Sequence, residues 1–340
     1  MKQLTKFLVV LLAITLLGVS CAAQNPAPAQ TTPPASSQPP ASEATPAAEA
    51  IVYKYVALPN DAGIMGQTAA DMIEEMNIAL KPFNVTVEYV AADDYAVVSE
   101  SILTGTAHIG TPSGATYVKS HLENPNVVPI FTTAPLGVLE EGGYPAYIAT
   151  HKDNADDFKG MSTEEALYSL KGKSFAFVSA TSTSGRLVPT TSLFKIFGPE
   201  GRAEITERAQ IFELTEAEGG IFSEIQYGGN HPGNIELILN GKVYAGAFCC
   251  QFAGDKFDEF YIISSETVPN GPWWVNKDFM KQEHVDALIA HFAQLTPDNA
   301  ATKLFEHAEE AGDEEINMDT RFVPVGPEFY SFLEEMYADE

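Results

Sequence analysis

Cysteine and basic residues are scarce in this chain of 340 residues. Three cysteines are too few for a fold that is held together by disulfides. Lysine and arginine number 19 against 46 aspartates and glutamates, and the formal net charge is −27. Because nucleic acids and anionic membrane surfaces bind basic patches, this balance argues against both as partners. Since 45% of the residues are hydrophobic and 10% aromatic, the chain can bury a large core, and its length favours two lobes.

Motifs of several enzyme and metal-binding classes are also missing. The chain has no Gly-x4-Gly-Lys-Ser/Thr stretch, which excludes a Walker-type nucleotide loop. The seven histidines are scattered, and His284 and His291 lie two turns apart on one expected helix, so we predict no metal site and no cofactor. No nucleophile, base and orienting group can be assembled into one site, which argues against an enzyme.

The N-terminus has the pattern of an export signal. Lys2 and Lys6 precede an apolar run at residues 7–19, which is shorter than the roughly 20 residues that a membrane-spanning helix needs. The run ends in Leu17-Gly-Val-Ser-Cys21, small residues directly before a cysteine, as at a bacterial lipoprotein cleavage site. We therefore predict that residues 1–20 are removed and that Cys21 carries a lipid. The alternative is an ordinary signal peptide with an incidental cysteine.

The segment after Cys21 has the composition of a tether. Residues 22–50 hold seven prolines among small and polar residues, without leucine, isoleucine, valine or an aromatic residue. Such a segment has no apolar surface to bury and should be extended, at about 3.1 Å per residue in the polyproline conformation. We predict that residues 21–50 hold a globular domain outside the cell, attached to the membrane by its lipid.

From residue 51 the hydrophobic pattern alternates between strands and helices. Strands are expected at 51–58, 85–90, 107–111, 127–133, 173–179, 243–249 and 260–264. Helices are expected at 61–80, 93–103, 113–121, 184–197, around 235–239, and at 281–295, 300–311 and 327–337. Repeated strand–helix–strand units predict an α/β fold with mostly parallel sheets covered by helices on both faces. Two such runs and a helical tail fit two lobes joined by crossing strands.

Turns at the carboxyl ends of strands are where ligands bind in open α/β sheets. The most informative turn is Ser179-Ala-Thr-Ser-Thr-Ser-Gly185, with five hydroxyls and a glycine between a strand and a helix. The unpaired N–H groups of the helix start and these hydroxyls together suit a tetrahedral oxyanion, without any lysine. The alternative is a simple helix cap, although capping requires one such residue rather than five.

Two further turns contain candidate ligand-binding residues. Thr111 and Ser113 lie in Gly110-Thr-Pro-Ser-Gly114, which resembles the hydrolase Gly-x-Ser-x-Gly elbow but has its serine in the wrong place. His231 ends a glycine-rich loop before a helix, where its ring can donate to a bound oxygen; otherwise it is a surface histidine. Cys249 and Cys250 suit a strained vicinal disulfide, a site for a soft ion, or simple burial at the end of an apolar strand.

Residues 182–189, Ser-Thr-Ser-Gly-Arg-Leu-Val-Pro, resemble the phosphate-, phosphite- and phosphonate-binding components of ABC importers, in which this stretch holds the ligand oxygens. Other stretches match that family in the same order: Asp94-Tyr95, 103–110, 229–231, 240–247 and 268–272. The resemblance covers roughly residues 51–340. It implies a type II periplasmic-binding-protein fold, in which two α/β lobes joined by a two-segment hinge close on the ligand. We expect residues 51–146 and 252–340 in one lobe and 147–251 in the other.

The resemblance also implies roles for single residues. Ser182, Thr183 and Ser184 would bind the oxygens of the ligand, and Tyr95 and His231 would complete the shell from the two lobes.

Gln251 is a further candidate ligand residue. Gln251 and Gly271 lie where family members that take aminophosphonates have a carboxylate for the amine. The resemblance therefore implies phosphite, a simple alkylphosphonate or another small oxyanion without an amine.

These features predict a monomeric, lipid-anchored, extracytoplasmic receptor that delivers a small oxyanion to an ABC permease in the membrane. The alternative function is a sensor of the same fold that presents its ligand to a histidine kinase. Arsenite is a candidate ligand for such a sensor because Cys249 and Cys250 are adjacent.

Overall fold

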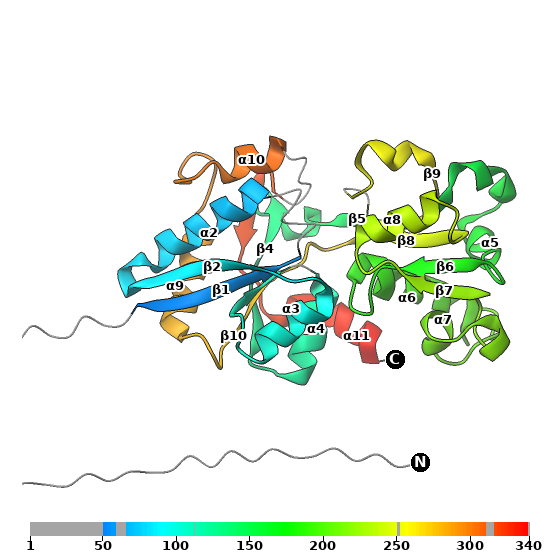
Figure 1. Cartoon of the computed structure of the whole chain (residues 1–340), viewed down its shortest axis with the longest axis horizontal. Coiled ribbons are helices and arrows are strands. Elements are labelled where there is room, and N and C mark those ends of the chain that lie inside the picture. Colours follow the sequence, from blue (N-terminus) through cyan, green and yellow to red (C-terminus); the bar gives the residue numbers. More distant parts are fainter. Residues whose placement is uncertain (1–49, 59–65, 112, 250–251, 311–315, 339–340) are drawn as a thin grey trace, which may run out of the picture. The chain divides into compact units, whose positions relative to one another are not determined.

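The computed structural model describes residues 50–58, 66–111, 113–249, 252–310 and 316–338 (Figure 1). The predicted signal peptide, the predicted lipid-bearing Cys21 and the predicted tether lie outside these residues, as do Cys250 and Gln251. The described part contains two β-sheets, each with helices packed on it.

Six strands of the described chain form the first sheet, in the order β11-β4-β10-β3-β1-β2. Their bounds are β1 Ile51–Ala57, β2 Val85–Ala91, β3 Ile109–Gly110, β4 Val127–Pro135, β10 Trp273–Asn276 and β11 Thr320–Val323. β1 pairs in parallel with β2 and β3. β10 is antiparallel to β3 and β4, and β11 is antiparallel to β4.

The second sheet has five strands within the described residues, in the order β7-β6-β8-β5-β9. Their bounds are β5 Tyr144–His151, β6 Ser174–Phe177, β7 Glu224–Tyr227, β8 Ala245–Cys249 and β9 Phe260–Val268. β6 is parallel to β7 and β8, whereas β5 is antiparallel to β8 and β9. Both sheets are therefore mixed rather than wholly parallel: β5, β10 and β11 run against their neighbours, and the other strands of each sheet share one direction, as predicted for mostly parallel sheets.

Helices connect the strands of both sheets. Their bounds are α2 Gly66–Leu80, α3 Tyr95–Leu103, α4 Gly114–Glu123, α5 Thr163–Tyr168, α6 Val188–Phe197, α7 Ala209–Phe212, α8 His231–Leu239, α9 Gln282–Phe292, α10 Leu304–Glu310 and α11 Ser331–Ala338. A single π-helical turn, η4 at Thr183–Leu187, leads into α6, and a 3-10 turn, η8 at Pro327–Tyr330, leads into α11. The predicted elements are present with shifted ends, whereas β5, β7, β10, β11, α5 and α7 were not predicted.

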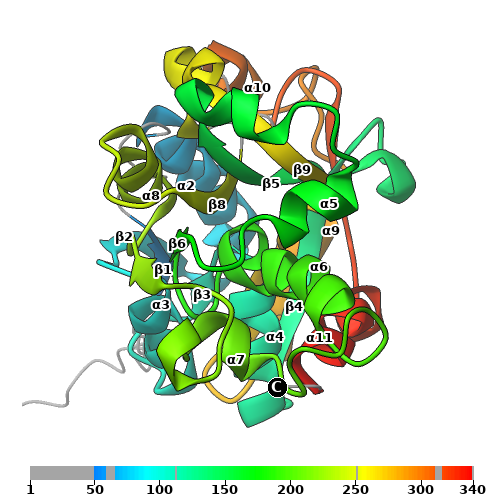
Figure 2. The ribbon, with the colours of Figure 1, turned by 90° about the vertical axis from the view of Figure 1, so that its right-hand side faces the viewer.

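Both sheets carry helices on their two faces, as predicted. Figure 2 shows α8 on one side of the second sheet and α5 and α6 on the other. On the first sheet, α2, α9 and α10 cover one face and α3, α4 and α11 the other. The adjacent Trp273 and Trp274 are both buried, and because strand side chains alternate, they enter opposite cores. We call the first sheet with its helices lobe 1, and the second sheet with its helices lobe 2.

The chain crosses between the lobes at residues 136–143 and 269–272. The predicted lobe boundaries need a correction here, because β9 lies in lobe 2, whereas residues 252–340 were expected in lobe 1. β9 pairs with β5 from Tyr144 opposite Val268 to His151 opposite Phe260. This pairing joins segments more than a hundred residues apart, and the local hydrophobic pattern contains no sign of it.

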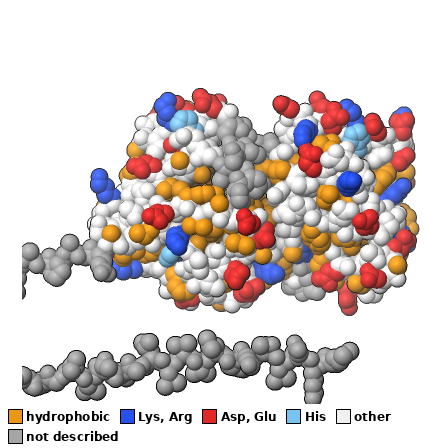
Figure 3. Space-filling model, viewed as in Figure 1, with side chains coloured by type: hydrophobic (Ala, Val, Ile, Leu, Met, Phe, Trp, Pro, Cys, Tyr) orange, Lys and Arg blue, Asp and Glu red, His pale blue; other side chains and the backbone are white. Residues whose placement is uncertain are grey.

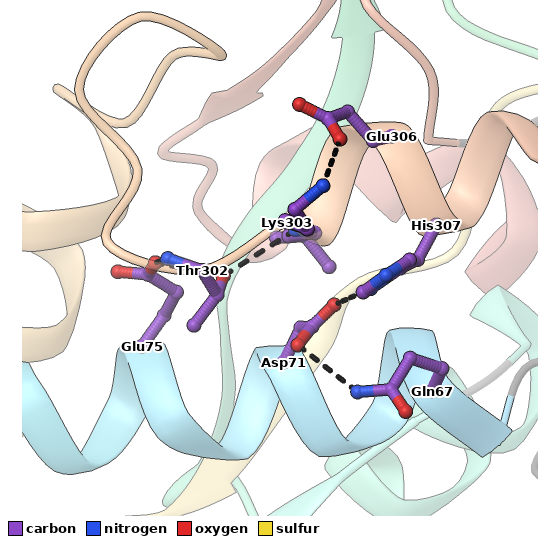
Figure 4. A network of polar contacts seen from close by, with 8 residues as sticks. Gln67, Asp71, Glu75, Thr302, Lys303, Glu306 and His307 are labelled. Atoms are coloured by element: carbon purple, nitrogen blue, oxygen red, sulfur yellow. Dashed lines mark hydrogen bonds and ion pairs between the residues drawn. The ribbon is translucent and has the colours of Figure 1, made fainter.

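Buried acids fasten α2 to the C-terminal part of lobe 1 (Figure 4). The fully buried Glu75 accepts hydrogen bonds from the backbone N–H and hydroxyl of Thr302, at 2.8 and 2.9 Å, and from Nε2 of His291 at 2.8 Å. One turn earlier, Asp71 accepts from Nδ1 of His307 at 2.6 Å. We call Asp71, Glu75, His291, Thr302 and His307 the acid–histidine cluster. Its carboxylates are tolerated inside the protein because each has hydrogen-bond donors, with Nε2 of Gln67 as a second donor to Asp71 at 3.4 Å.

Candidate functional site

Two helix starts, one from each lobe, meet through hydroxyl groups. Ser113 caps α4, and its Oγ accepts from the backbone N–H of Thr116 at 3.4 Å. Across the lobe boundary, Oγ1 of Thr183 lies 3.0 Å from Oγ of Ser113 and accepts the backbone N–H of Ala115 at 2.9 Å. The turns after β3 and β6, which the sequence singled out, are therefore in direct contact.

Thr181 adds a second layer to this contact. Its backbone oxygen accepts from Oγ of Ser113 at 3.1 Å and from Oγ1 of Thr116 at 3.0 Å. We call Ser113, Thr116, Thr181 and Thr183 the hydroxyl cluster, and all four residues are buried. Thr116 was not predicted as a site residue, although its position three residues after Ser113 places both side chains on the same end of the helix.

The hydroxyl cluster depends on close backbone packing around it. A Cβ atom on Gly185 would lie 2.3 Å from Cγ2 of Val178, so only glycine allows the π turn to pack against the end of β6. Ser182 starts that turn and accepts from the N–H of Gly185 at 3.1 Å. Ser113 has φ of 75°, a conformation that costs a non-glycine residue about 1–3 kcal/mol and that persists where surrounding contacts impose it.

The remaining lobe 1 candidates lie beside the cluster. Tyr95 is the first residue of α3, which Asp94 caps by accepting the N–H of Val97 at 2.9 Å. Tyr95 is buried in the same hydrophobic core as Ala115 of lobe 1 and Leu187 of lobe 2. The backbone N–H of Thr111 donates to the oxygen of Val56, at 3.3 Å, where β3 ends.

The lobe 2 candidates Ser182, Thr183 and Ser184 are each about 1% exposed, so the π turn is an interior feature. Arg186 lies in the same turn, and its Nε and Nη2 donate to the backbone oxygen of Ala180 at 2.9 and 2.6 Å. Its guanidinium also lies 4.4 Å from the centre of the Phe212 ring. The turn thus contains a buried positive charge, and two of its hydrogen bonds go to the backbone just after the preceding strand.

His231 is the first residue of α8 and is buried, so its interpretation as a surface histidine is wrong. Burial lowers the pKa of its imidazole to about 3, and the ring is neutral at physiological pH. The backbone N–H of Cys249 donates to Nδ1 at 3.3 Å, which leaves the ring hydrogen on Nε2. Sulfur of Cys249 lies 3.4 Å from Nε2, and Phe252 stacks on the ring at 4.8 Å. His231 is therefore held as a neutral donor.

Cys249 is buried at the end of β8 among Tyr144, Ala146, Val188 and Val268, in agreement with its interpretation as a core residue. The next two residues, Cys250 and the predicted ligand residue Gln251, lie outside the described residues. Within the part of the chain that the structure describes, no group of three or more histidine, cysteine or acidic side chains is placed to hold a metal ion.

The site therefore combines neutral donors with two helix starts. β8, whose last residue Cys249 donates to His231, contacts the π turn, so His231 and Thr183 lie on neighbouring elements of lobe 2. Backbone N–H groups at a helix start have a partial positive charge and hold anions without a formal cation. The arrangement is suited to binding a small oxyanion by short-range hydrogen bonds.

Comparison with known proteins gives an independent view. The sequence model of a family described as "ABC transporter, phosphonate, periplasmic substrate-binding protein" matches residues 57–320. A phosphate-import protein of Mycolicibacterium smegmatis, PhnD, is 28% identical over 233 residues, which are 65% of this chain. That match spans 64% of the length of the relative, slightly less than two thirds.

Solved structures share the fold at lower sequence identity. PhnD1 of Prochlorococcus marinus, in complex with methylphosphonate, is 17% identical with a TM-score of 0.64, over 84% of this chain and 97% of PhnD1. A binding-protein component of an ABC phosphonate transporter from Pseudomonas aeruginosa is 15% identical with a TM-score of 0.62, over 85% and 86% of the two chains. These likenesses confirm the predicted two-lobed fold of type II periplasmic-binding proteins.

In residues 50–338, apart from the gaps in the described chain, no helix has the length and apolar character needed to span a bilayer.

Proposed function

Because the chain belongs to the family of periplasmic substrate-binding proteins of phosphonate ABC transporters, we propose that it binds a small phosphorus oxyanion between its lobes and delivers it to a membrane permease. The observation that carries this proposal is the contact of Thr183 with the start of α4. There a hydroxyl oxygen accepts the N–H of Ala115 and meets the hydroxyl of Ser113. A ligand oxyanion also requires donors such as the backbone N–H of Ala115 and the hydroxyl of Ser113.

Electrostatics favour recognition at short range. The chain has a formal charge of −27, and Figure 3 shows acidic side chains spread over both parts of the visible face. An anion is therefore repelled at a distance and is held only where fixed dipoles act in a medium of low dielectric constant. The starts of η4 and α4, the neutral His231 and the nearby buried Arg186 supply such a field.

We further propose that the ligand lacks an amine. A Cβ atom on Gly271 would lie 3.0 Å from the backbone nitrogen of Ser113, so the chain has no room at this position for a larger side chain without a shift. Together with Gln251, this leaves an amide and a glycine where a carboxylate would be required. Phosphite, phosphate and methylphosphonate are the resulting candidate ligands. With Gly271 and Gln251 at these positions, we expect 2-aminoethylphosphonate not to bind.

A thermal-shift panel with phosphite, phosphate, methylphosphonate, 2-aminoethylphosphonate, sulfate and arsenite tests this proposal. A ligand at 100 times its dissociation constant stabilises the folded protein by about 2.7 kcal/mol, which gives a clear rise in melting temperature. We expect one phosphorus oxyanion without an amine to give the largest rise. A response only to 2-aminoethylphosphonate would contradict the argument from Gly271, and no response to any phosphorus oxyanion would contradict the proposed ligand class.

The sensor function is the second candidate. In the sequence, the adjacent Cys249 and Cys250 were the support for an arsenite sensor. The structure weakens that support, because Cys249 is buried and its sulfur lies against the ring of His231. The arsenite arm of the panel decides between the two functions. A response to arsenite alone favours the sensor.

We also propose that the protein is a monomer held at the outer face of the membrane by a lipid on Cys21. The support is the signal pattern, the proline-rich composition of residues 22–50, and the periplasmic location that the family description states. Replacement of Cys21 by alanine should move the protein from the membrane fraction to the soluble fraction of producing cells. Cys249→Ala is the matched control, and retention of Cys21→Ala in the membrane would contradict the lipid anchor.

A further inference from the structure

The C-terminal helix α11 packs on the start of α4. A Cβ atom on Gly114 would lie 2.7 Å from Cδ1 of Leu333, so the leucine covers the first residue of α4. One turn later, the hydroxyl of Tyr337 donates to the backbone oxygen of Ala115 at 3.3 Å. Figure 1 shows α11 beside α4, although the two helices are more than 200 residues apart in sequence.

The same helix also contacts lobe 2. Met336 packs against a buried cluster that includes Val188, at the start of α6, and Cys249, at the end of β8. The guanidinium of Arg186, in the π turn, lies 5.7 Å from the centre of the Tyr337 ring, within the range of a cation–π interaction. Tyr337 thus lies beside the π turn that carries Thr183, and Met336 packs on the cluster that contains Cys249, whose backbone N–H donates to His231.

The chain leading into α11 is fastened to a crossing segment between the lobes. Tyr330 is fully buried, and its hydroxyl donates to the backbone oxygen of Asn270 at 2.8 Å. The same oxygen accepts from Oγ1 of Thr132 at 3.0 Å. One end of the C-terminal segment is therefore fixed where the chain crosses between the lobes, and the other end reaches the candidate ligand site.

From these contacts we propose that α11 is a clasp, a non-covalent third connection that holds the two lobes together when no ligand is bound. Met336 and Tyr337 are its positioning residues: they act on Thr183 and Ser113 through the helices that carry them. The expected effect on affinity rests on the proposed function, whereas the effect on the ligand-free protein does not.

The clasp has a direct consequence for opening of the lobes. Opening separates the π turn from α4 and must therefore part Tyr337 from either Arg186 or Ala115. A restraint of this kind raises the fraction of ligand-free protein in the closed, binding-competent arrangement. Apparent affinity scales with that fraction, so weakening the clasp raises the dissociation constant without changing any group that touches the ligand.

The test measures the distance between the lobes in the full-length chain, with spin labels on unnatural amino acids at the exposed positions 88 and 164, in β2 and α5. The variants are Tyr337→Ala and the double variant Met336→Ala with Tyr337→Ala. The control is Glu335→Ala, an exposed residue on the same helix. Melting temperatures and near-ultraviolet circular dichroism identify any variant that has lost its fold, and Tyr337→Ala alone then carries the test.

Without ligand, we expect longer or broader distances in both variants and unchanged distances in the Glu335→Ala control. With methylphosphonate as the probe, we expect a return to the short distance and a three- to tenfold higher dissociation constant. If the ligand-free variants show the same distances as the unaltered protein, the proposal that α11 is a clasp is wrong. If the distances change as expected but methylphosphonate binds to neither protein, the clasp stands and the choice of this ligand is what fails.

Discussion

The acid–histidine cluster and the hydroxyl cluster are both buried and polar, but they bury different chemical groups. In the first, Glu75 and Asp71 are matched to specific donors within lobe 1, on α9, on α10 and on the segment that leads into α10. In the second, Ser113 and Thr183 contact each other across the lobe boundary. A hydroxyl both donates and accepts, so it changes partners without leaving a charge uncompensated, whereas a buried carboxylate does not.

This difference explains why one cluster suits structure and the other suits a ligand. Loss of a partner from a buried carboxylate is strongly unfavourable, so the acid–histidine cluster should behave as a permanent fastening of α2. The hydroxyl cluster lies where the two lobes meet, and under the proposed function its bonds are exchanged for bonds to a bound oxyanion. The predictions below test this contrast, starting with the largest expected effect.

Glu75→Leu should destabilise the protein by about 3–5 kcal/mol, because it leaves the N–H and hydroxyl of Thr302 and the ring of His291 without their acceptor. Urea unfolding measures this change. The control is Glu74→Leu, an exposed neighbour on the same helix. Ligand affinity of the folded variant should remain unchanged, and a large loss of affinity would show that the two clusters are not functionally separate.

His231 should make stability depend on pH. Its pKa is about 3 in the folded protein, because of burial, against an ordinary value of 6.5. Below pH 6.5 the unfolded chain therefore binds a proton that the folded protein does not, so stability falls as the pH is lowered. The loss is about 2 kcal/mol at pH 5.

His231→Gln removes the titrating group and keeps an amide donor in its place. Unfolding at pH 7.5 and pH 5 should therefore differ less in this variant than in the unaltered protein. His151→Gln, which changes a more exposed histidine, is the control. An equal pH dependence in the unaltered protein and in His231→Gln would contradict the neutral, buried state of this ring.

Thr183→Ala should weaken binding of the panel's best ligand at least tenfold, about 1.4 kcal/mol, without unfolding the protein. It removes the oxygen that meets Ser113 and Ala115, and with it a donor for the ligand. Isothermal titration calorimetry measures the affinity. Thr190→Ala, a buried threonine on α6 at 0% exposure, is the matched control and should bind normally. An unchanged affinity in Thr183→Ala would remove the π turn from the site.

Local pattern was sufficient for most of lobe 1. The alternation at residues 85–90 and the helical spacing before Leu80 have counterparts in β2 and α2, since amphipathic periodicity follows directly from burial of one face. The helix predicted at 93–103 is α3, which begins at Tyr95, directly after its cap Asp94. In contrast, β11 is only four residues long, Thr320–Val323, and owes its existence to pairing with β4. No short-range pattern marks it.

The turn at residues 179–185 likewise has features that the sequence indicates and features that depend on tertiary contacts. Its composition singled it out, and the family resemblance implied Ser182, Thr183 and Ser184 as ligand residues; the structure places all three in the interior at the start of η4. That Thr183 meets Ser113 was not predictable, because 70 residues and a lobe boundary separate them. The neutral state of His231 likewise depends on burial that a glycine-rich loop sequence does not indicate.

The sequence by itself determined that this is an acidic α/β protein, and it predicts an export signal, a proline-rich tether and a turn of the oxyanion-binding type. These properties depend on composition and on neighbours within a few residues. Only the tertiary structure decided the antiparallel course of β5 and β10, the membership of β9 in lobe 2, and the contact of α11 with both lobes. These features arise from pairing and packing between distant segments, whose free energy depends on the whole chain rather than on any short stretch of it.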